Sequence, residues 1–205
     1  MGRLFGLVVT ISSLYWLYQH STTTNRLVPT NPPAAASQLF SPPSPQSAQV
    51  HYSPSEDLEQ IDLSALRAST GTLEIAMYAF TDRRIADQIV AIADAGRPVY
   101  LYRDGEQFNR EEQSSRDSGY PSTTALFRNH TNIHVQVKAA STSTLMHLKS
   151  WTDGTVLRTG SANWSPAGLQ VQDNDARYTV DSAQINAFAQ QFRRAWDRPT
   201  NTLVQ

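Results

Sequence analysis

Residues 73–102 read LEIAMYAFTDRRIADQIVAIADAGRPVYLY, and the order of patterns within them indicates the fold class. Apolar runs at 73–80 and 99–102 are typical of buried or half-buried strands. Between them, isoleucines recur on one face of a predicted helix over 83–95, and Asp82 is a favourable N-cap. A glycine and a proline then end the helix. A strand, a helix and a strand in this order predict two parallel strands joined by a right-handed crossover.

The residues after this unit extend the predicted sheet. Asp153-Gly154 lies between two apolar runs and is a strong signal for a β-hairpin. Strands are predicted over residues 133–137, 145–151, 155–159 and 177–180, and helices over 123–129 and over 182–196, the latter capped by Ser182. The sequence therefore predicts an α/β fold in which helices flank a mixed β-sheet.

The N-terminal part of the chain differs in composition from the rest. All 18 acidic residues lie at or beyond Glu56, and only two of the 17 Lys and Arg residues, Arg3 and Arg26, precede it. Residues 1–18 are apolar and end in aromatic side chains, and as a helix they would be about 26 Å long. We interpret them as an uncleaved membrane anchor, with a cleaved secretory signal as the alternative. Arg3 favours an N-terminus on the cytoplasmic side of a bacterial membrane and hence a periplasmic domain; secretion or an organellar membrane are the alternatives.

The segment after the apolar stretch has the composition of a linker. Residues 19–55 hold seven of the 11 prolines and many Ser, Thr and Gln residues. Such a segment is expected to be extended and semi-rigid. We therefore predict a linker over 19–55 and a catalytic domain over 56–205.

Composition excludes several classes of function. The net charge is −1, which argues against a protein that coats nucleic acid through a strongly basic surface. The sequence contains no cysteine, which excludes disulfide scaffolds, zinc ribbons, thiol catalysis and iron–sulfur clusters. A local basic face remains possible, and its candidate residues are Arg83, Arg84, Arg103 and Arg110.

The residues that indicate chemistry lie between Met146 and Val180. His147 and Lys149 are two residues apart, so on a strand both side chains project to one face. Gly160-Ser161-Ala162-Asn163 follows, where small residues let the backbone approach a ligand and the hydroxyl and amide can hold an oxyanion. Together these side chains form a set suited to phosphate.

This set resembles the signature of the phospholipase D superfamily, which is His-x-Lys, an Asp, and Gly-Ser-x-Asn. The matching residues here are HLK, Asp153 and GSANWS, and the likeness extends over most of residues 65–200. The most similar members carry a single motif; they include endonucleases associated with bacterial conjugative plasmids and mitochondrial cardiolipin hydrolases. The resemblance implies a phospholipase D-like fold.

One spacing departs from the family pattern. Members usually have four residues between the motif's Lys and Asp, whereas only three separate Lys149 from Asp153. Either the hairpin is one residue shorter, or Asp153 is an ordinary turn residue before a glycine.

The resemblance implies hydrolysis of a phosphodiester without a metal or another cofactor. His147 would attack phosphorus to form a phosphohistidine, and a second His would protonate the leaving oxygen. Lys149, Ser161 and Asn163 would bind and stabilise the phosphoryl group. An acid would orient the partner imidazole; Asp173 and Asp175 both lie near that position, and the QDN sequence favours Asp173. Because the chain has one His-x-Lys, we expect a homodimer with a shared active site.

Three functions are compatible with these residues. The first is a nuclease of low sequence specificity, with DNA or RNA as substrate. The second is a hydrolase of a membrane phospholipid of the cardiolipin type, and the third is a catalytically silent, membrane-tethered binding module.

Other features have less specific interpretations. The charged segment Arg103–Asp117 is either a solvated helix or loop or a flap beside the active cleft. His130 and His134 have a spacing that could hold a metal on a helix, but a strand over 133–137 would keep them apart. Trp164 is interpreted as a core residue rather than a base-stacking one.

Overall fold

The computed structural model describes residues 48–204. The predicted anchor or signal at 1–18 and most of the predicted linker lie outside the described residues. Among the helices within 48–204, none is both long and apolar enough to cross a bilayer.

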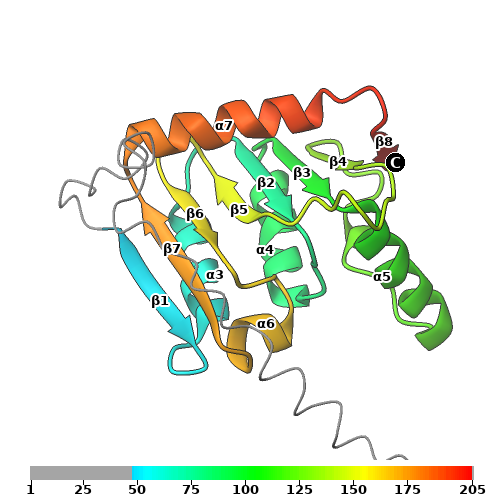
Figure 1. Ribbon diagram of the computed structural model, residues 1–205, viewed down its shortest axis with the longest axis horizontal. Coiled ribbons are helices and arrows are strands. Elements are labelled where there is room, and N and C mark those ends of the chain that lie inside the picture. Colours follow the sequence, from blue (N-terminus) through cyan, green and yellow to red (C-terminus); the bar gives the residue numbers. More distant parts are fainter. Residues whose placement is uncertain (1–47, 205) are drawn as a thin grey trace, which may run out of the picture. The chain divides into compact units, whose positions relative to one another are not determined.

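The centre of the domain is an eight-stranded mixed sheet with the strand order β1-β7-β6-β5-β2-β3-β4-β8 (Figure 1). The strands are β1 (Gln49–Ser53), β2 (Leu73–Met77), β3 (Val99–Arg103), β4 (Ile133–Val137), β5 (Lys149–Thr152), β6 (Leu157–Gly160), β7 (Asn174–Thr179) and β8 (Thr202–Val204). β2, β3 and β4 are parallel, and all other neighbouring pairs are antiparallel. The prediction of a mixed sheet is confirmed.

The strand–helix–strand unit forms as its sequence predicts. Leu73 of β2 pairs with Val99 of β3 in a parallel register. Between them α4 (Arg83–Asp94) begins after Asp82, whose carboxylate accepts a hydrogen bond from the Ile85 amide at 3.0 Å. The isoleucines of α4 are buried against the sheet, so its apolar face holds the helix in place.

Helices cover both faces of the sheet. Core residues of α3 (Leu58–Ala68), α4 and the short α6 (Pro166–Gln170) pack with those of the strands on one face. The long α7 (Ser182–Trp196) packs on the other face, where Phe192 contacts the cluster around Ala76 and Tyr102 (Figure 1). The domain thus has three layers, and the sheet is the middle one.

The charged segment after β3 is a regular helix. α5 (Gly105–Ser118) begins after Asp104 and ends at Gly119, which has a positive φ of 75°. A short 3-10 helix, η1 (Thr124–Leu126), follows where the sequence predicts a helix over 123–129. Most of Arg103–Asp117 is therefore helical, which leaves the flap interpretation open, and the position of α5 beside the site is described below.

Several boundaries differ from the predictions, including those of β1, α7 and β5. β1 lies in the predicted linker and pairs with β7, so the folded domain begins before Glu56. Its sequence, QVHYS, is mostly exposed and alternates little between apolar and polar residues. The sequence therefore gives little indication of this edge strand, which depends on pairing with β7 for its stability. The N-cap of α7 is Asp181 rather than Ser182. β5 starts at Lys149, so His147 precedes the strand.

Candidate active site

The HLK and GSAN segments meet at the C-terminal end of β2. The Tyr78 amide donates to the Leu148 carbonyl oxygen at 2.9 Å, and the next amide, of Ala79, donates to Oδ1 of Asn163 at 3.2 Å. Two consecutive residues after β2 therefore bind both halves of the motif. This brings together residues that are 15 or more positions apart in the chain.

His147 and Lys149 form the centre of the site. Nζ of Lys149 lies 3.0 Å from Nδ1 of His147 and 2.9 Å from the His147 carbonyl oxygen. Lys149 is only 5% exposed, whereas His147 is exposed to solvent. The Tyr78 ring lies under both groups, 4.5 Å from the His147 ring and 4.8 Å from Nζ. The prediction that the two side chains lie together is met, although His147 precedes the strand.

This arrangement shifts the ionisation of both groups. Burial, together with the charge of Arg158, lowers the pKa of Lys149 to about 8. Burial and then the charge of Lys149 lower the pKa of His147, while Asp104 acts in the opposite direction. The imidazole is therefore favoured in its neutral form, which is the form that can act as a nucleophile.

The GSAN loop is held against β7 by a reciprocal pair of hydrogen bonds. The Ser161 amide donates to Oδ1 of Asp175 at 2.9 Å, and the Asp175 amide donates to Oγ of Ser161 at 2.9 Å. A Cβ atom at position 160 would lie 2.3 Å from the Asp175 carbonyl oxygen, so this close approach requires Gly160.

Of the two candidate acids, Asp175 contacts the GSAN loop. Asp173 lies in the loop before β7 and lines a surface cavity with Ser161 and Asp175, but it makes no hydrogen bond to the motif among the described residues. Which of the two orients the partner imidazole stays a prediction. The register of β7 against β6, in which Ala176 pairs with Gly160, places Asp175 beside Ser161.

Asp153, which the motif also offers as a candidate functional acid, has the contacts of a turn residue; its catalytic role stays a prediction. It lies at the far end of β5, four residues or about 13 Å along the strand from Lys149. Its carboxylate accepts hydrogen bonds from the amides of Thr70, Thr155 and Val156 and from the Thr155 hydroxyl, at 2.8 to 3.1 Å. Burial opposes ionisation, but these hydrogen bonds together lower the pKa of Asp153 to about 2.

A buried ionic network that the sequence analysis missed supports the site from beneath. Nη1 of Arg158 donates to the carbonyl oxygens of Lys149 at 2.8 Å and Ala162 at 3.1 Å, one in each half of the motif. Nη2 of Arg158 lies 3.1 Å from Oδ2 of Asp62 on α3, and both side chains are fully buried. Arg158 therefore fixes the two halves of the motif relative to each other.

Asp62 is surrounded by donors from three strands and from the loop after β6. Besides Arg158, it accepts hydrogen bonds from Trp151 Nε1 at 3.3 Å, Trp164 Nε1 at 3.1 Å and Tyr178 Oη at 2.7 Å. Burial raises the pKa of Tyr178 above its usual range. Trp164 is fully buried, as predicted for a core residue. In the sequence, this buried pair is indicated only by Asp62, a charged residue among the apolar positions of α3.

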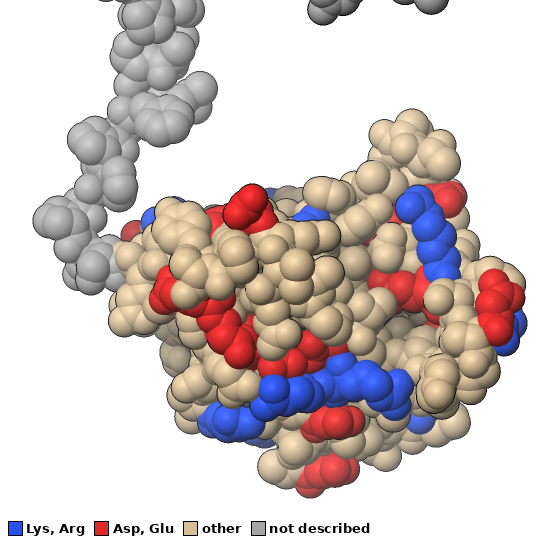
Figure 2. Space-filling view, turned by 90° about the horizontal axis from the view of Figure 1, so that it is seen from below, with Lys and Arg blue, Asp and Glu red and all other residues tan. Residues whose placement is uncertain are grey.

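Arg103 does not belong to a basic surface. It is fully buried and forms an ion pair of 2.6 Å with Glu111 of α5. Its Nε donates to the Met77 carbonyl oxygen at 3.0 Å, so it supports the end of β2. The other three arginines of the predicted basic face are exposed. On the face seen from below in Figure 1, a row of basic side chains is bordered by acidic ones (Figure 2), so this face carries both signs of charge.

The remaining histidines have separate partners. Nε2 of His130 lies 3.0 Å from Oδ1 of Asp94, and His134 stacks on Tyr100 with ring centroids 5.0 Å apart. Within 48–204, no group of three or more His, Asp or Glu side chains is arranged to hold a metal ion.

Comparison with known proteins identifies the family. The family profile described as "Cardiolipin synthase, PLD-like domain" matches residues 63–196, well over half of the chain. The chain therefore belongs to the phospholipase D-like family, as the HLK and GSAN motifs predict.

Individual relatives agree with this assignment. The chain is 26% identical over 135 residues to the mitochondrial cardiolipin hydrolase of Chlamydomonas reinhardtii, and the match covers 66% of this chain and 56% of that protein. NucT from Helicobacter pylori has a similar structure, with a TM-score of 0.63 and 21% identity over 74% of this chain and 96% of NucT. Nuc from Salmonella typhimurium, a phospholipase D family member, has a TM-score of 0.62 and 20% identity over 78% of this chain and 98% of Nuc. The chain thus spans little more than half the length of that hydrolase, and it shares its fold with NucT and Nuc.

Proposed function

We propose that this protein hydrolyses phosphodiesters through a phosphohistidine on His147, without a metal, and that its substrate is DNA or RNA. The observation that carries the proposal is the Lys149 ammonium 3.0 Å from the His147 ring, next to the Asn163 amide. A nucleophile and two phosphate-binding groups are thereby held at one end of the sheet.

The reaction proceeds in two balanced steps. A ring nitrogen of His147 forms a bond to phosphorus while the bond from phosphorus to the leaving oxygen breaks, and a second imidazole gives that oxygen its proton. The same imidazole then takes a proton from water, which attacks phosphorus and breaks the nitrogen–phosphorus bond. Lys149, Asn163 and Ser161 stabilise the additional negative charge in both transition states.

The second imidazole is supplied by a second copy of the chain. No other histidine among residues 48–204 contacts the site: His51, His130 and His134 have partners elsewhere. A two-fold homodimer that places two HLK segments on opposite sides of one phosphate supplies the missing acid. The N-terminal segment would anchor this dimer to a membrane with the catalytic domain in the periplasm.

A phospholipid of the cardiolipin type is the second candidate substrate. It is favoured by the similarity to a mitochondrial cardiolipin hydrolase. The predicted proline-rich linker favours nucleic acid, because it would hold the site away from the bilayer.

The deciding experiment offers EDTA-treated protein three substrates: DNA, RNA and vesicles that contain cardiolipin. We expect cleavage of nucleic acid that persists in EDTA, together with an acid-labile phosphoprotein that is absent from His147→Ala. Loss of activity in EDTA with recovery on Mg²⁺ or Zn²⁺ contradicts the metal-independent mechanism. Hydrolysis of the cardiolipin vesicles alone would make a phospholipid, not nucleic acid, the substrate. A protein that hydrolyses none of them is the silent binding module.

A further inference from the structure

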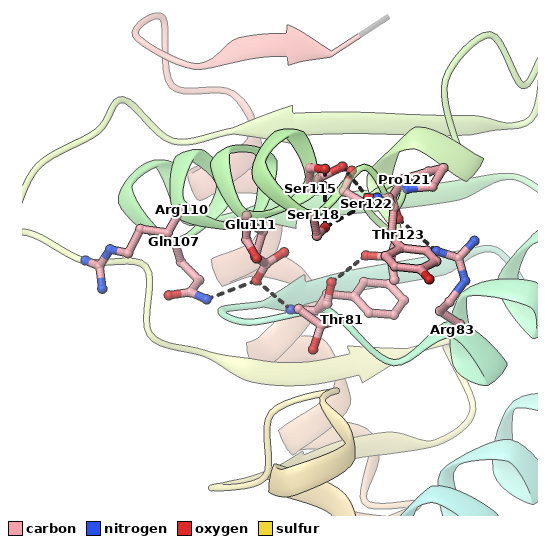
Figure 3. A pocket seen from close by; sticks show the side chains of 13 residues that line it. Thr81, Arg83, Gln107, Arg110, Glu111, Ser115, Ser118, Pro121, Ser122 and Thr123 are labelled. Atoms are coloured by element: carbon pink, nitrogen blue, oxygen red, sulfur yellow. Dashed lines mark hydrogen bonds between the residues drawn. The ribbon is translucent and has the colours of Figure 1, made fainter.

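A groove outside the HLK and GSAN motifs opens beside the site. The connection from β2 to α4 forms one wall, and α5 with the residues after it forms the other (Figure 3). Its volume is about 430 Å³, which lies in the range of pockets that bind small molecules or single nucleotide units. Many of its lining side chains are hydroxyls, which belong to Ser114, Ser115, Ser118, Ser122 and Thr123.

The groove is continuous with the phosphate-binding residues through the backbone after β2. The Ala79 amide binds Asn163, and the next amide, of Phe80, donates to Oε1 of Glu111 in the groove at 3.1 Å. Adjacent Cα atoms are about 3.8 Å apart. The backbone after β2 therefore contributes both to the motif and to the groove wall, and a chain substrate with one phosphate at Asn163 would extend toward this groove.

The floor of the groove carries no uncompensated negative charge. Glu111 is its acidic lining residue, and Arg103 neutralises it through the buried ion pair of 2.6 Å. Gln107 Nε2 also donates to Glu111 at 3.1 Å. The carboxylate is occupied by three donors and therefore does not repel an anionic substrate.

Two exposed arginines lie at opposite ends of the groove, as Figure 3 shows for Arg83 and Arg110. Among the residues that the structure describes, Arg110 makes no hydrogen bond or ion pair, and Arg83 donates only one, to the Pro121 carbonyl oxygen at 2.8 Å. Two separated guanidinium groups suit successive phosphates of one chain better than a single phosphate. Tyr120, which is 78% exposed, offers an aromatic face for a base on the same wall.

We propose that this groove binds single-stranded nucleic acid on one side of the scissile phosphate, with Arg83 and Arg110 on flanking phosphates. Two guanidinium groups and an exposed aromatic ring suit the phosphates and a base of a nucleic acid, whereas an acyl chain offers neither kind of partner. The proposal rests on the proposed function, since it names the substrate class of the same site. It also explains why a charged α5 lies beside the motif.

The test compares substrates that do and do not reach the groove. The double variant Arg83→Gln/Arg110→Gln is assayed on a short single-stranded oligonucleotide and on bis(p-nitrophenyl) phosphate, which has no flanking nucleotide. We expect KM for the oligonucleotide to rise about tenfold and the slope of log KM against log salt to fall by about 1.4. Hydrolysis of bis(p-nitrophenyl) phosphate should be unchanged. Arg194→Gln, on α7, is the matched control because within residues 48–204 the Arg194 side chain bonds only Gln191 of its own helix.

A binding measurement separates failure of the groove from failure of the proposed function. Fluorescence anisotropy of the labelled oligonucleotide with His147→Ala, with and without the two arginine changes, reports the groove without turnover. Unchanged affinity, unchanged oligonucleotide KM, or an equal loss on both substrates overturns the groove proposal. The groove proposal is also overturned if the double variant loses activity on cardiolipin vesicles but on no other substrate. If the wild-type protein hydrolyses no phosphodiester but the arginine changes weaken binding, only the proposed function fails.

Discussion

Nζ of Lys149 lies 3.0 Å from Nδ1 of His147, and both side chains contact the ring of Tyr78. The contact couples the charges of the two residues: a protonated Lys149 makes protonation of His147 less favourable. The contact also holds the Lys149 ammonium next to the position of a phosphate that His147 would attack.

We expect a bell-shaped dependence of kcat/KM on pH. Activity should rise as pH increases through the lowered pKa of His147, because attack requires the neutral ring. It should fall above a pH of about 8, where Lys149 loses its proton. The proton of the second imidazole also contributes to the alkaline limb, at a lower pH. Lys149→Arg should lower kcat and remove only the component of the fall near pH 8. Lys138→Arg, at the other lysine, should leave the profile unchanged. A component near pH 8 that persists in Lys149→Arg would assign it to another group.

The two aspartates near the motif should behave differently on substitution. Asp153→Asn should reduce stability by about 1–2 kcal/mol, since it weakens several hydrogen bonds to a buried turn, and should leave kcat of the folded protein intact. Asp175→Asn should lower kcat, because it loosens the Ser161 loop. Urea unfolding and steady-state kinetics measure these two effects.

The lowered pKa of Asp153 also makes a prediction for acid stability. Its folded pKa of about 2 lies below the unfolded value of about 3.9. Its stabilisation is therefore complete above about pH 4 and is lost as pH falls from there toward 2. Asp153→Asn should be less stable than wild type at pH 7, and the difference should shrink across that interval. A constant difference would contradict the turn assignment.

Local signals explain which parts of this structure the sequence could predict. The β2–α4–β3 unit has its cap, periodicity and terminators within 30 residues, and the HLK and GSAN segments are recognisable from residue types alone. Asp62 is different, because its partner Arg158 is 96 positions away and nothing near either residue indicates the other. The contact of Asp175 with Ser161 likewise depends on the register of β6 and β7, which the residues around Asp175 do not indicate.

The buried pair of Asp62 and Arg158 should affect both stability and turnover. Asp62→Asn leaves Arg158 buried without its counter-charge and should cost about 3–5 kcal/mol. Arg158→Met removes the donors to Lys149 and Ala162 and should lower kcat of the folded enzyme at least about tenfold with a smaller change in KM. Arg158→Lys should restore part of kcat. Ile89→Ala, in the core of α4, is the control: it should cost about 2–5 kcal/mol but leave kcat intact. Equal kcat values in Arg158→Met and Ile89→Ala would reduce Arg158 to a purely structural residue.

A domain that starts at residue 48 should be more stable than one that starts at residue 56. The shorter fragment lacks β1, including the Ser53 hydroxyl that donates to the Gln172 carbonyl oxygen at 2.7 Å. It also exposes the edge of β7 beside Tyr178, which binds Asp62. We expect Tm to be at least about 5 °C lower for 56–205, since about 1 kcal/mol shifts Tm by 2–4 °C in a domain of this size. Identical melting curves would restore Glu56 as the boundary.

The last prediction concerns the shared site of the proposed dimer. One chain supplies one imidazole at the site, yet transfer of a proton to the leaving oxygen requires a second group that titrates near neutral pH. Two-fold symmetry would bring a second His147 to the opposite side of the phosphate. The two rings are chemically identical but must hold different protonation states during each step, as coupled groups do.

Mixing His147→Ala chains with wild-type chains tests this arrangement. After subunit exchange, a heterodimer lacks one of the two imidazoles, so activity should approach the square of the wild-type fraction rather than the fraction itself. Exchange is verified by pulling down one tagged chain and detecting the other. Because His147 is exposed to solvent and lies outside the hydrophobic clusters of the described residues, the variant should fold and exchange subunits. Strict proportionality after verified exchange would mean that each chain is active alone and that the leaving oxygen obtains its proton from within one subunit.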